Sequence, residues 1–260
     1  MSNVICHTEP GQCPIVMYGA RTREGHHYTF GVLISRLTCR DTTVTIPVMK
    51  VKLSVAILIA ILLSSAAAIQ DYFFGDLFLT RSIQEIRLSR WEETMGMVST
   101  IGRALPMSVL GLACFIWFLW RKQKAEYIVL GAALLSLAVN PVLKVLVDRP
   151  RPTEDLVVIL RDVTGLGFPS GHAYTAMVLF GLLFYLTPIV VPWRRMIPFL
   201  RLLFLSLIIL MGVSRVYLGA HWPSDVLGGF LIGAIVLTFL VLLHRHQSER
   251  WSISRLLTSP

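Results

Sequence analysis

The chain has 260 residues, of which 55% are hydrophobic and 15% are charged, and its mean hydropathy is +0.67. This composition excludes a disordered chain, a coiled coil and a disulfide-rich secreted module, and it indicates a multi-pass membrane protein. The net charge of +9 is typical of cytoplasmic loops that face anionic lipid, so we expect no nucleic-acid partner.

Residues 1–48 differ from the rest of the chain in their weak periodicity and mixed polarity. They contain Cys6, Cys13 and Cys39, whose spacing fits no zinc site, so we predict no metal there. We expect an N-terminal extension that is poorly ordered or not translated, with Met49 as an alternative start.

Apolar stretches of about twenty residues, the length that crosses a bilayer as a helix, recur from residue 53 onward. The predicted spans are Leu53–Ile69, Ala104–Trp120, Tyr127–Leu143, Ala173–Val191, Ile197–Ser214 and Val226–Leu243. The prediction is therefore an all-α, six-transmembrane helix bundle over residues 49–245, followed by a tail at 246–260.

Lys and Arg in the short connections predict the orientation. Basic clusters precede the first span, separate the second from the third and the fourth from the fifth, and follow the sixth. With six spans, all of them fall on one side, so we expect an integral membrane protein with both termini cytoplasmic. The compact size and short loops indicate a bacterial cytoplasmic membrane. The outer segments 144–172 and 215–225 carry cations against this rule, which suggests a separate role for them.

The first of three notable clusters follows the third span. Lys144 ends that span, and Arg151 lies between Pro150 and Pro152, which stop a helix and favour an extended backbone. The two cations can then face a common point. Taken alone, the cluster would also fit a stop-transfer sequence whose cations reach the lipid headgroups.

The second cluster precedes the fourth span, where a helix N-terminus offers free N–H groups and a positive dipole end. Ser170 suits capping or a hydroxyl hydrogen bond, and Gly171 lets a ligand approach the backbone. We predict an anion cradle with His172 beside it. A plain helix cap with a solvated histidine is the alternative.

The third cluster closes the fifth span and opens the sixth. If the new helix begins by His221, then His221 and Asp225 are neighbours at i, i+4, with Arg215 nearby. A carboxylate that holds one imidazole nitrogen leaves the other lone pair free, which favours a nucleophile or base. A structural ion pair that caps a helix is the alternative.

All three clusters face the same predicted side. A phosphate requires such charge neutralisation, and phosphoryl transfer requires a nucleophile in line with the leaving oxygen and an acid behind it. Together the clusters resemble the signature of the type 2 phosphatidic acid phosphatase superfamily, in its membrane lipid phosphatase branch. The matching positions are Lys144, Arg151, Pro152, Pro169, Ser170, Gly171, His172, Ser214, Arg215, His221 and Asp225.

The resemblance covers about residues 53–243 and implies a histidine phosphatase site at the extracytoplasmic ends of helices three to six. It implies that His221 forms a phosphohistidine, that Asp225 orients it, and that His172 is the general acid. The phosphate ligands that it implies are Lys144, Arg151, Ser170, Gly171 and Arg215. It implies no cofactor and no metal. Asp148 is left unassigned, and for Arg149 we favour an auxiliary phosphate or headgroup contact.

The predicted function is hydrolysis of a lipid phosphomonoester or diphosphate, of the phosphatidic acid or isoprenoid diphosphate type. The partners expected are the lipid substrate and the bilayer, and the sequence predicts no oligomeric state. One alternative is a lipid phosphotransferase that passes the phosphoryl group to another lipid. A non-catalytic membrane transporter is a second alternative, suggested by Pro141 within the third span.

Overall fold

The computed structural model describes residues 4–5, 16–21, 28–32, 42–86, 88–161 and 164–258. They fall into two compact units, Met1–Val55 and Ala56–Pro260. The first unit contains a three-stranded antiparallel sheet in the order β1-β2-β3, which the sequence analysis did not predict. Its strands are β1 (Val4–Ile5), β2 (Val16–Arg21) and β3 (Tyr28–Val32). Cys6, Cys13 and Cys39 lie outside the described residues, and the late start at Met49 stays a prediction.

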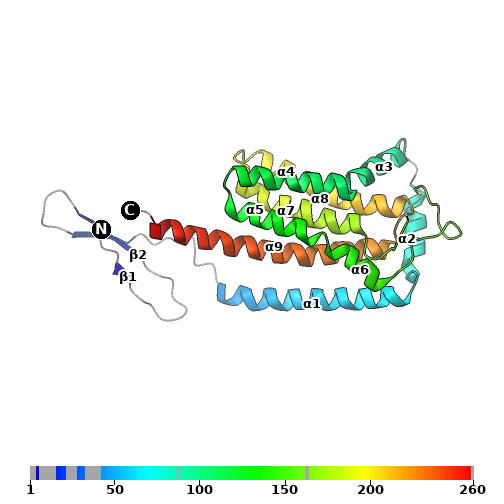
Figure 1. The fold of residues 1–260 in the computed structure, drawn as a ribbon, viewed down its shortest axis with the longest axis horizontal. Helices are drawn as coiled ribbons and strands as arrows, with labels where there is room; N and C mark the ends of the chain where they lie inside the picture. The colour runs from blue at the N-terminus through cyan, green and yellow to red at the C-terminus, as the bar shows by residue number, and fades with distance from the viewer. Residues whose placement is uncertain are drawn as a thin grey trace. The chain divides into compact units, whose positions relative to one another are not determined.

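The described residues from Ala56 onward form helices and no strand, as predicted for the bundle (Figure 1). Helix α1 (Thr42–Ile69) begins in the first unit and ends in the second. The remaining helices are α2 (Phe74–Gln84), α3 (Trp91–Ile101), α4 (Ala104–Trp120), α5 (Lys124–Ser136), α6 (Val139–Val147), α7 (Gly171–Val190), α8 (Met196–Tyr217) and α9 (Pro223–Thr258).

Five stretches of helix in the described part of the chain are long and apolar enough to cross a bilayer. A sixth is reached if α3 and α4, which meet at a bend of 54°, are counted as one span. The third predicted span is a pair of helices, α5 and α6, separated at Leu137 and Ala138. Pro141 explains this break, because its ring clashes with the carbonyl four residues earlier.

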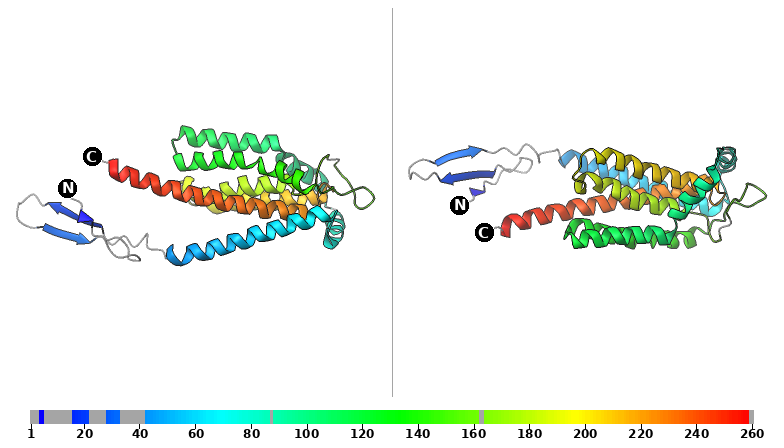
Figure 2. Two further views of the ribbon diagram at one scale, coloured as in Figure 1. Left: turned by 60° about the horizontal axis from the view of Figure 1, so that its bottom comes forward. Right: turned by 90° about the horizontal axis from the view of Figure 1, so that it is seen from above.

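Two short helices, α2 and α3, lie between the first and second predicted spans, where no helix was predicted. The carboxylate of Asp76 starts α2, because its Oδ2 accepts a hydrogen bond from the backbone N–H of Phe73 at 2.9 Å. Helix α2 packs against α8 and α9 and crosses one end of the bundle (Figure 2). The chain between α1 and α3 is thereby held at this end.

Helix α7 forms the centre of the bundle and packs most extensively against α8 and α9. Two glycines of α9 allow this close approach. A Cβ at Gly229 would lie 2.6 Å from the carbonyl oxygen of Ser170, and one at Gly233 would lie 2.9 Å from the Cβ of Met177. Small residues four apart are a common way for membrane helices to pack backbone against backbone.

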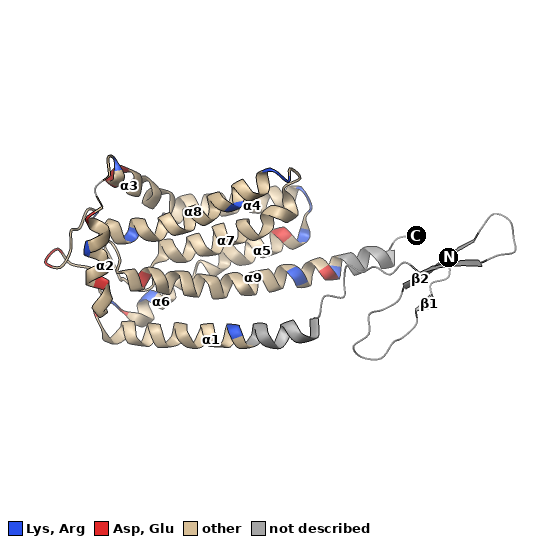
Figure 3. Ribbon diagram, turned by 180° about the vertical axis from the view of Figure 1, so that it is seen from behind, with Lys and Arg blue, Asp and Glu red and all other residues tan. Residues whose placement is uncertain are grey.

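Charged residues gather at the ends of the helices, and the middle of the bundle carries few of them (Figure 3). Large apolar side chains are exposed along α1, α4 and α8, such as Leu62, Leu105 and Leu202. A surface of this kind is stable when lipid covers it, which accounts for the high apolar content.

Candidate active site

Three connections meet at the end of the bundle that α2 crosses. They are the exit from α6, the start of α7 and the turn between α8 and α9. The structure places every predicted site residue at this end: Lys144, Arg151, Ser170, Gly171, His172, Arg215, His221 and Asp225. Clusters that are far apart in the sequence are therefore brought into one region.

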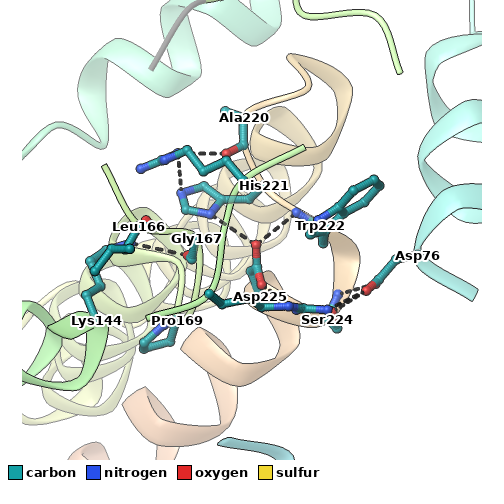
Figure 4. A network of polar contacts seen from close by, with 12 residues as sticks. Asp76, Lys144, Leu166, Gly167, Pro169, Ala220, His221, Trp222, Ser224 and Asp225 are labelled. Carbon is teal, nitrogen blue, oxygen red and sulfur yellow. Dashed lines mark hydrogen bonds and ion pairs between the residues drawn. The ribbon is translucent and has the colours of Figure 1, made fainter. Parts of the chain in front are cut away.

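The side chains of His221 and Asp225 face each other, as predicted (Figure 4). Nδ1 of His221 lies 3.4 Å from Oδ2 of Asp225, an ion-pair contact longer than a good hydrogen bond. The same Oδ2 accepts a hydrogen bond from the backbone N–H of Trp222 at 3.0 Å. Both side chains are buried, so the carboxylate orients the imidazole from a fixed position.

The turn that creates this pair differs in one respect from the prediction. Helix α9 begins at Pro223, two residues after His221, so the contact crosses the helix start. Gly219 ends α8 with φ of +70°, and a Cβ there would lie 2.3 Å from the carbonyl oxygen of Val158. Only glycine suits this position, from which the chain turns back and the backbone N–H of His221 reaches the carbonyl of Arg215 at 3.2 Å.

Two cations lie next to the histidine, and backbone carbonyls hold both of them. Nη1 of Arg151 donates to the carbonyl of Ala220 at 2.7 Å and to Nε2 of His221 at 3.2 Å. Nζ of Lys144 donates to the carbonyl of Leu166 at 2.6 Å. Because a guanidinium can only donate, Nε2 of His221 is the acceptor and carries the lone pair.

The pKa of His221 lies well below its usual value. Burial is the largest cause, since it disfavours the charged imidazole, and the charges of Arg151, Arg215 and Lys144 act in the same direction. Burial likewise lowers the pKa of Arg151, although Asp225 opposes this change. His221 is therefore neutral near pH 7, the form in which a histidine is a nucleophile.

Ser170 occupies the N-cap position of α7, as predicted, but its hydroxyl makes no capping hydrogen bond. Its Oγ is fully buried and has no hydrogen-bond partner among the residues that the structure describes. Gly171 follows at the first helical position, where a Cβ would lie 3.0 Å from Oδ1 of Asn140. A buried free hydroxyl next to a helix N-terminus suits an anion oxygen.

His172 and Arg215 share Ser99 of α3 as a partner. Nε2 of His172 lies 3.1 Å from the carbonyl of Ser99, and Nη1 of Arg215 donates to the hydroxyl of the same residue. The contact with a carbonyl places a proton on Nε2 of His172 and leaves Nδ1 free to exchange one. Ser99 thus holds His172 next to Arg215, and both lie at the end of the bundle that carries His221.

The preference for Arg149 as a phosphate or headgroup contact is wrong in this structure. Its guanidinium is completely buried and lies between two carboxylates, at 2.6 Å from Asp225 and 3.1 Å from Asp76. The direction of the side chain follows from Asp148, which ends α6 in the left-handed region with φ of 53°. The chain thus turns Arg149 toward the protein interior.

Sequence reasoning missed Asp76, Ser99 and Asn140, which contact the predicted residues from other segments. All three are buried. Asn140 lies in the apolar helix α6, where a polar side chain is costly unless it is paired, and this cost is a signal in the sequence. Asp76 and Ser99 lie in short helices with several polar residues, so the sequence gives no such signal for them.

Comparison with known proteins agrees with the geometry. Residues 125–249 match the model of the PAP2 superfamily. Decaprenylphosphoryl-5-phosphoribose phosphatase of Mycobacterium tuberculosis is 30% identical over 151 residues, which cover 54% of this chain and 77% of that protein. The chain belongs to the PAP2 superfamily.

Two further PAP2 relatives come from Bacillus subtilis. Phosphatidylglycerophosphatase B is 29% identical over 174 residues, which cover 64% of this chain and 81% of that protein. The crystal structure of a transmembrane PAP2 type phosphatidylglycerolphosphate phosphatase superposes with a TM-score of 0.62 and 25% identity, covering 75% of this chain and 96% of that chain. This PAP2 protein is accordingly a phosphatase, as the sequence predicted.

Proposed function

We propose that this PAP2 protein hydrolyses a lipid phosphomonoester or diphosphate through a phosphohistidine on His221. The observation that carries the proposal is the environment of that imidazole. Its Nδ1 faces the Asp225 carboxylate at 3.4 Å, and its Nε2 lone pair faces the Arg151 guanidinium at 3.2 Å. A phosphate held by Arg151 would lie next to the nucleophilic atom.

In the first step, Nε2 of His221 attacks phosphorus, and an N–P bond forms as the bond to the leaving oxygen breaks. His172 gives a proton to that oxygen. Lys144, Arg151 and Arg215 neutralise the charge on the phosphoryl oxygens, and the Ser170 hydroxyl and Gly171 N–H donate hydrogen bonds to them. The negative charge of the bound phosphate among these cations favours the protonated form of His172.

In the second step, His172 takes a proton from water, and the resulting hydroxide attacks phosphorus. The N–P bond breaks, phosphate is released and His221 returns to its neutral form. Asp225 stabilises the positive charge that develops on the His221 ring in both steps. In both steps, the cations of the protein neutralise the charge on the phosphoryl oxygens. We therefore propose that the reaction proceeds without a metal.

A groove between α1, α6 and α9 supports a lipid as the substrate. It has a volume of about 450 Å³ and is lined by apolar residues, including Ile61, Leu146 and Ile232. Leu143 and Val147 of the same groove flank Lys144 on the last turns of α6. A lipid whose phosphate reaches Lys144 would have its chain beside this groove.

A second pocket, of about 370 Å³, borders Arg151 and Ala220 and extends to Arg161. Arg161 is held there by a hydrogen bond to Oγ1 of Thr100 at 3.2 Å. The pocket would take the part of the headgroup that does not react. The carboxylate of Glu154 also lines the pocket, so its charged lining consists of two cations and one anion. The excess cation favours a second phosphate, and we therefore propose a preference for lipid diphosphates.

The distribution of charge supports a site on the extracytoplasmic side. The connection between α4 and α5 and the one between α7 and α8 carry Arg121, Lys122, Arg194 and Arg195, and both lie at the end of the bundle away from His221. By the positive-inside rule that opposite end faces the cytoplasm. We therefore propose a bacterial cytoplasmic membrane protein with both termini inside.

The test is phosphate release by purified protein from lipid mono- and diphosphates in one detergent. We expect His221→Asn to lose activity by about 10⁴-fold or more, with His246→Asn, an exposed histidine of α9, as the matched control. Transfer of labelled phosphate to a second lipid, with little free phosphate, would point to the phosphotransferase. Full activity of His221→Asn would refute the proposal.

A further inference from the structure

Arg149 lies at the centre of a buried network that connects the start of α2 to the catalytic pair. Its Nη1 donates to Oδ1 of Asp225 at 2.6 Å and to Oγ of Ser224 at 2.8 Å. Its Nη2 donates to Oδ2 of Asp76 at 3.1 Å. The guanidinium therefore joins two carboxylates that lie far apart in the sequence.

The chain between α1 and α2 encloses the other sides of this guanidinium. Nε of Arg149 donates to the carbonyls of Gln70 and Asp71, both at 3.1 Å. The ring of Phe73 lies 4.7 Å from the guanidinium carbon, in the range of a cation–π contact. Each nitrogen of the group thus has a hydrogen-bond partner within the protein, and the buried side chain does not face a substrate site.

Asp76 is held as firmly as Arg149. Its Oδ1 accepts from the backbone N–H of Ser224 at 2.9 Å, and its Oδ2 accepts from the hydroxyl of Ser224 at 2.6 Å. Figure 4 shows Asp76, Ser224, Asp225 and His221 in succession. Asp76 therefore fixes the first turn of α9, the turn that presents Asp225 to His221.

The charges of this network influence the protonation of Asp225 and His221. Asp76, Arg149 and Asp225 carry a net charge of about −1 when all three are ionised, and all are buried. A buried carboxylate takes up a proton unless a cation opposes it. Arg149 is the cation that contacts Asp225. Its loss would leave the negative charge of Asp225 uncompensated next to His221, and this favours the protonated imidazole of His221.

We propose that Arg149 and Asp76 are positioning residues, which hold Asp225 ionised and oriented behind His221. The corner between α1 and α2 is then part of the catalytic machinery, although none of its residues touches the substrate. The inference rests on the proposed phosphatase function. It adds Asp76 and its segment of the chain to the three motifs, and it gives a role to Arg149, which lies within the first of them.

The test compares Arg149→Met, which removes the charge, with Arg149→Lys, which keeps the charge and loses the planar fork. We expect both to lower kcat by about 10²-fold with KM within about twofold. The acid limb of kcat/KM should move to higher pH in Arg149→Met and stay near the wild-type pH in Arg149→Lys. If Arg149 had only a structural role, the acid limb of kcat/KM would stay at the wild-type pH in both variants.

The pH of the acid limb of kcat/KM also depends on other charged or titratable groups around His221, which the variants leave in place. They are Lys144 of α6, Arg151 of the loop after α6, His172 of α7, Arg215 of α8 and Asp225 of α9. Each pH profile is therefore measured as a difference from the wild type on the same substrate.

The double variant Arg149→Met with Asp76→Asn restores the net charge of about −1, because one cation and one anion are lost together. We expect its acid limb to return toward the wild-type pH and its melting temperature in detergent to exceed that of Arg149→Met. If Arg149→Met does not fold, Asp76→Asn alone carries the test through a loss of about tenfold in kcat at unchanged KM. Glu85→Gln, an exposed carboxylate that caps the end of α2, is the control and should match the wild type.

Wild-type kcat in folded Asp76→Asn, or equal acid limbs in Arg149→Met and Arg149→Lys, would overturn the inference and leave the phosphatase intact. A folded wild-type protein that releases no phosphate from any lipid phosphate would instead refute the proposed function on which the inference rests.

Discussion

Arg151 donates a hydrogen bond from Nη1 to Nε2 of His221 across 3.2 Å. The contact assigns the imidazole proton to Nδ1, toward Asp225, and the lone pair to the side that the cations surround. The same guanidinium is anchored on the carbonyl of Ala220. A single side chain thus contacts the imidazole nitrogen that we propose as the nucleophile and lies where the phosphoryl oxygens would bind.

Replacement of Arg151 by Gln should change the pH dependence of the enzyme. Arg151 is one of the charges that lower the pKa of His221, so its loss raises that pKa and moves the acid limb of kcat/KM to higher pH. The kcat of Arg151→Gln should be about 10²–10³-fold lower than that of the wild type. Phosphate release between pH 4 and 8, about the range in which histidine titrates, is the measurement, with Arg151→Lys as the charge-conserving control. An acid limb at lower pH in Arg151→Gln would contradict this assignment.

Chelation of divalent metals should leave the activity unchanged. Lys144, Arg151 and Arg215 supply the positive charge that a metal supplies in other phosphatases. Activity in excess EDTA should match the untreated enzyme, and vanadate, which mimics the transferring phosphoryl group, should inhibit. Loss of activity in EDTA that added Mg²⁺ restores would show that these cations do not suffice.

Arg161→Ala should discriminate between substrate classes. Its guanidinium lines the pocket beside Arg151, so it would contact the second phosphate of a diphosphate and nothing on a monophosphate. We expect kcat/KM for a lipid diphosphate to fall about tenfold, the value of one charge-assisted hydrogen bond, with little change for the matching monophosphate. Arg90→Ala, on the exposed turn before α3, is the control. Equal losses on both substrates would place Arg161 outside the headgroup pocket.

Gly229→Ala and Gly233→Ala should both destabilise the bundle, by about 1–3 kcal/mol each, because the added methyl group has no space. A Cβ at Gly229 would meet Ser170, Ala173 and Tyr174 at the start of α7, whereas one at Gly233 would meet Tyr174 and Met177 but not Ser170. Gly229→Ala should therefore also lower phosphatase activity, and Gly233→Ala should lower only the melting temperature. Gly75→Ala, with nothing within 4 Å, is the control. An unchanged melting temperature in both variants would contradict the packing of α7 against α9.

The arrangements that the sequence predicted and the structure contains are local ones. Asp225 follows His221 by four residues, and Ser170 stands directly before α7, so a helix start alone brings these groups into place. The positions of the spans were predictable because apolar length determines them, apart from the bend between α3 and α4 and the break before Pro141.

Arg149 shows where such reasoning ends. Its neighbours in the sequence favour a phosphate contact, but the left-handed backbone of Asp148 turns it inward, and its partner Asp76 lies 73 residues away. Ser99 likewise meets Arg215 across 116 residues. Contacts of this kind depend on how the helices pack, which no spacing within one motif encodes.

The most direct test of the proposed mechanism is to trap the phosphorylated enzyme. Purified protein is mixed briefly with a lipid substrate labelled in its terminal phosphate and quenched in alkali, because phosphohistidine is stable in alkali and labile in acid. The account predicts label on the peptide that contains His221, and none in His221→Asn. Label on another residue, or turnover with no labelled protein at any time point in wild type and in a slowed His172→Asn variant, would contradict it.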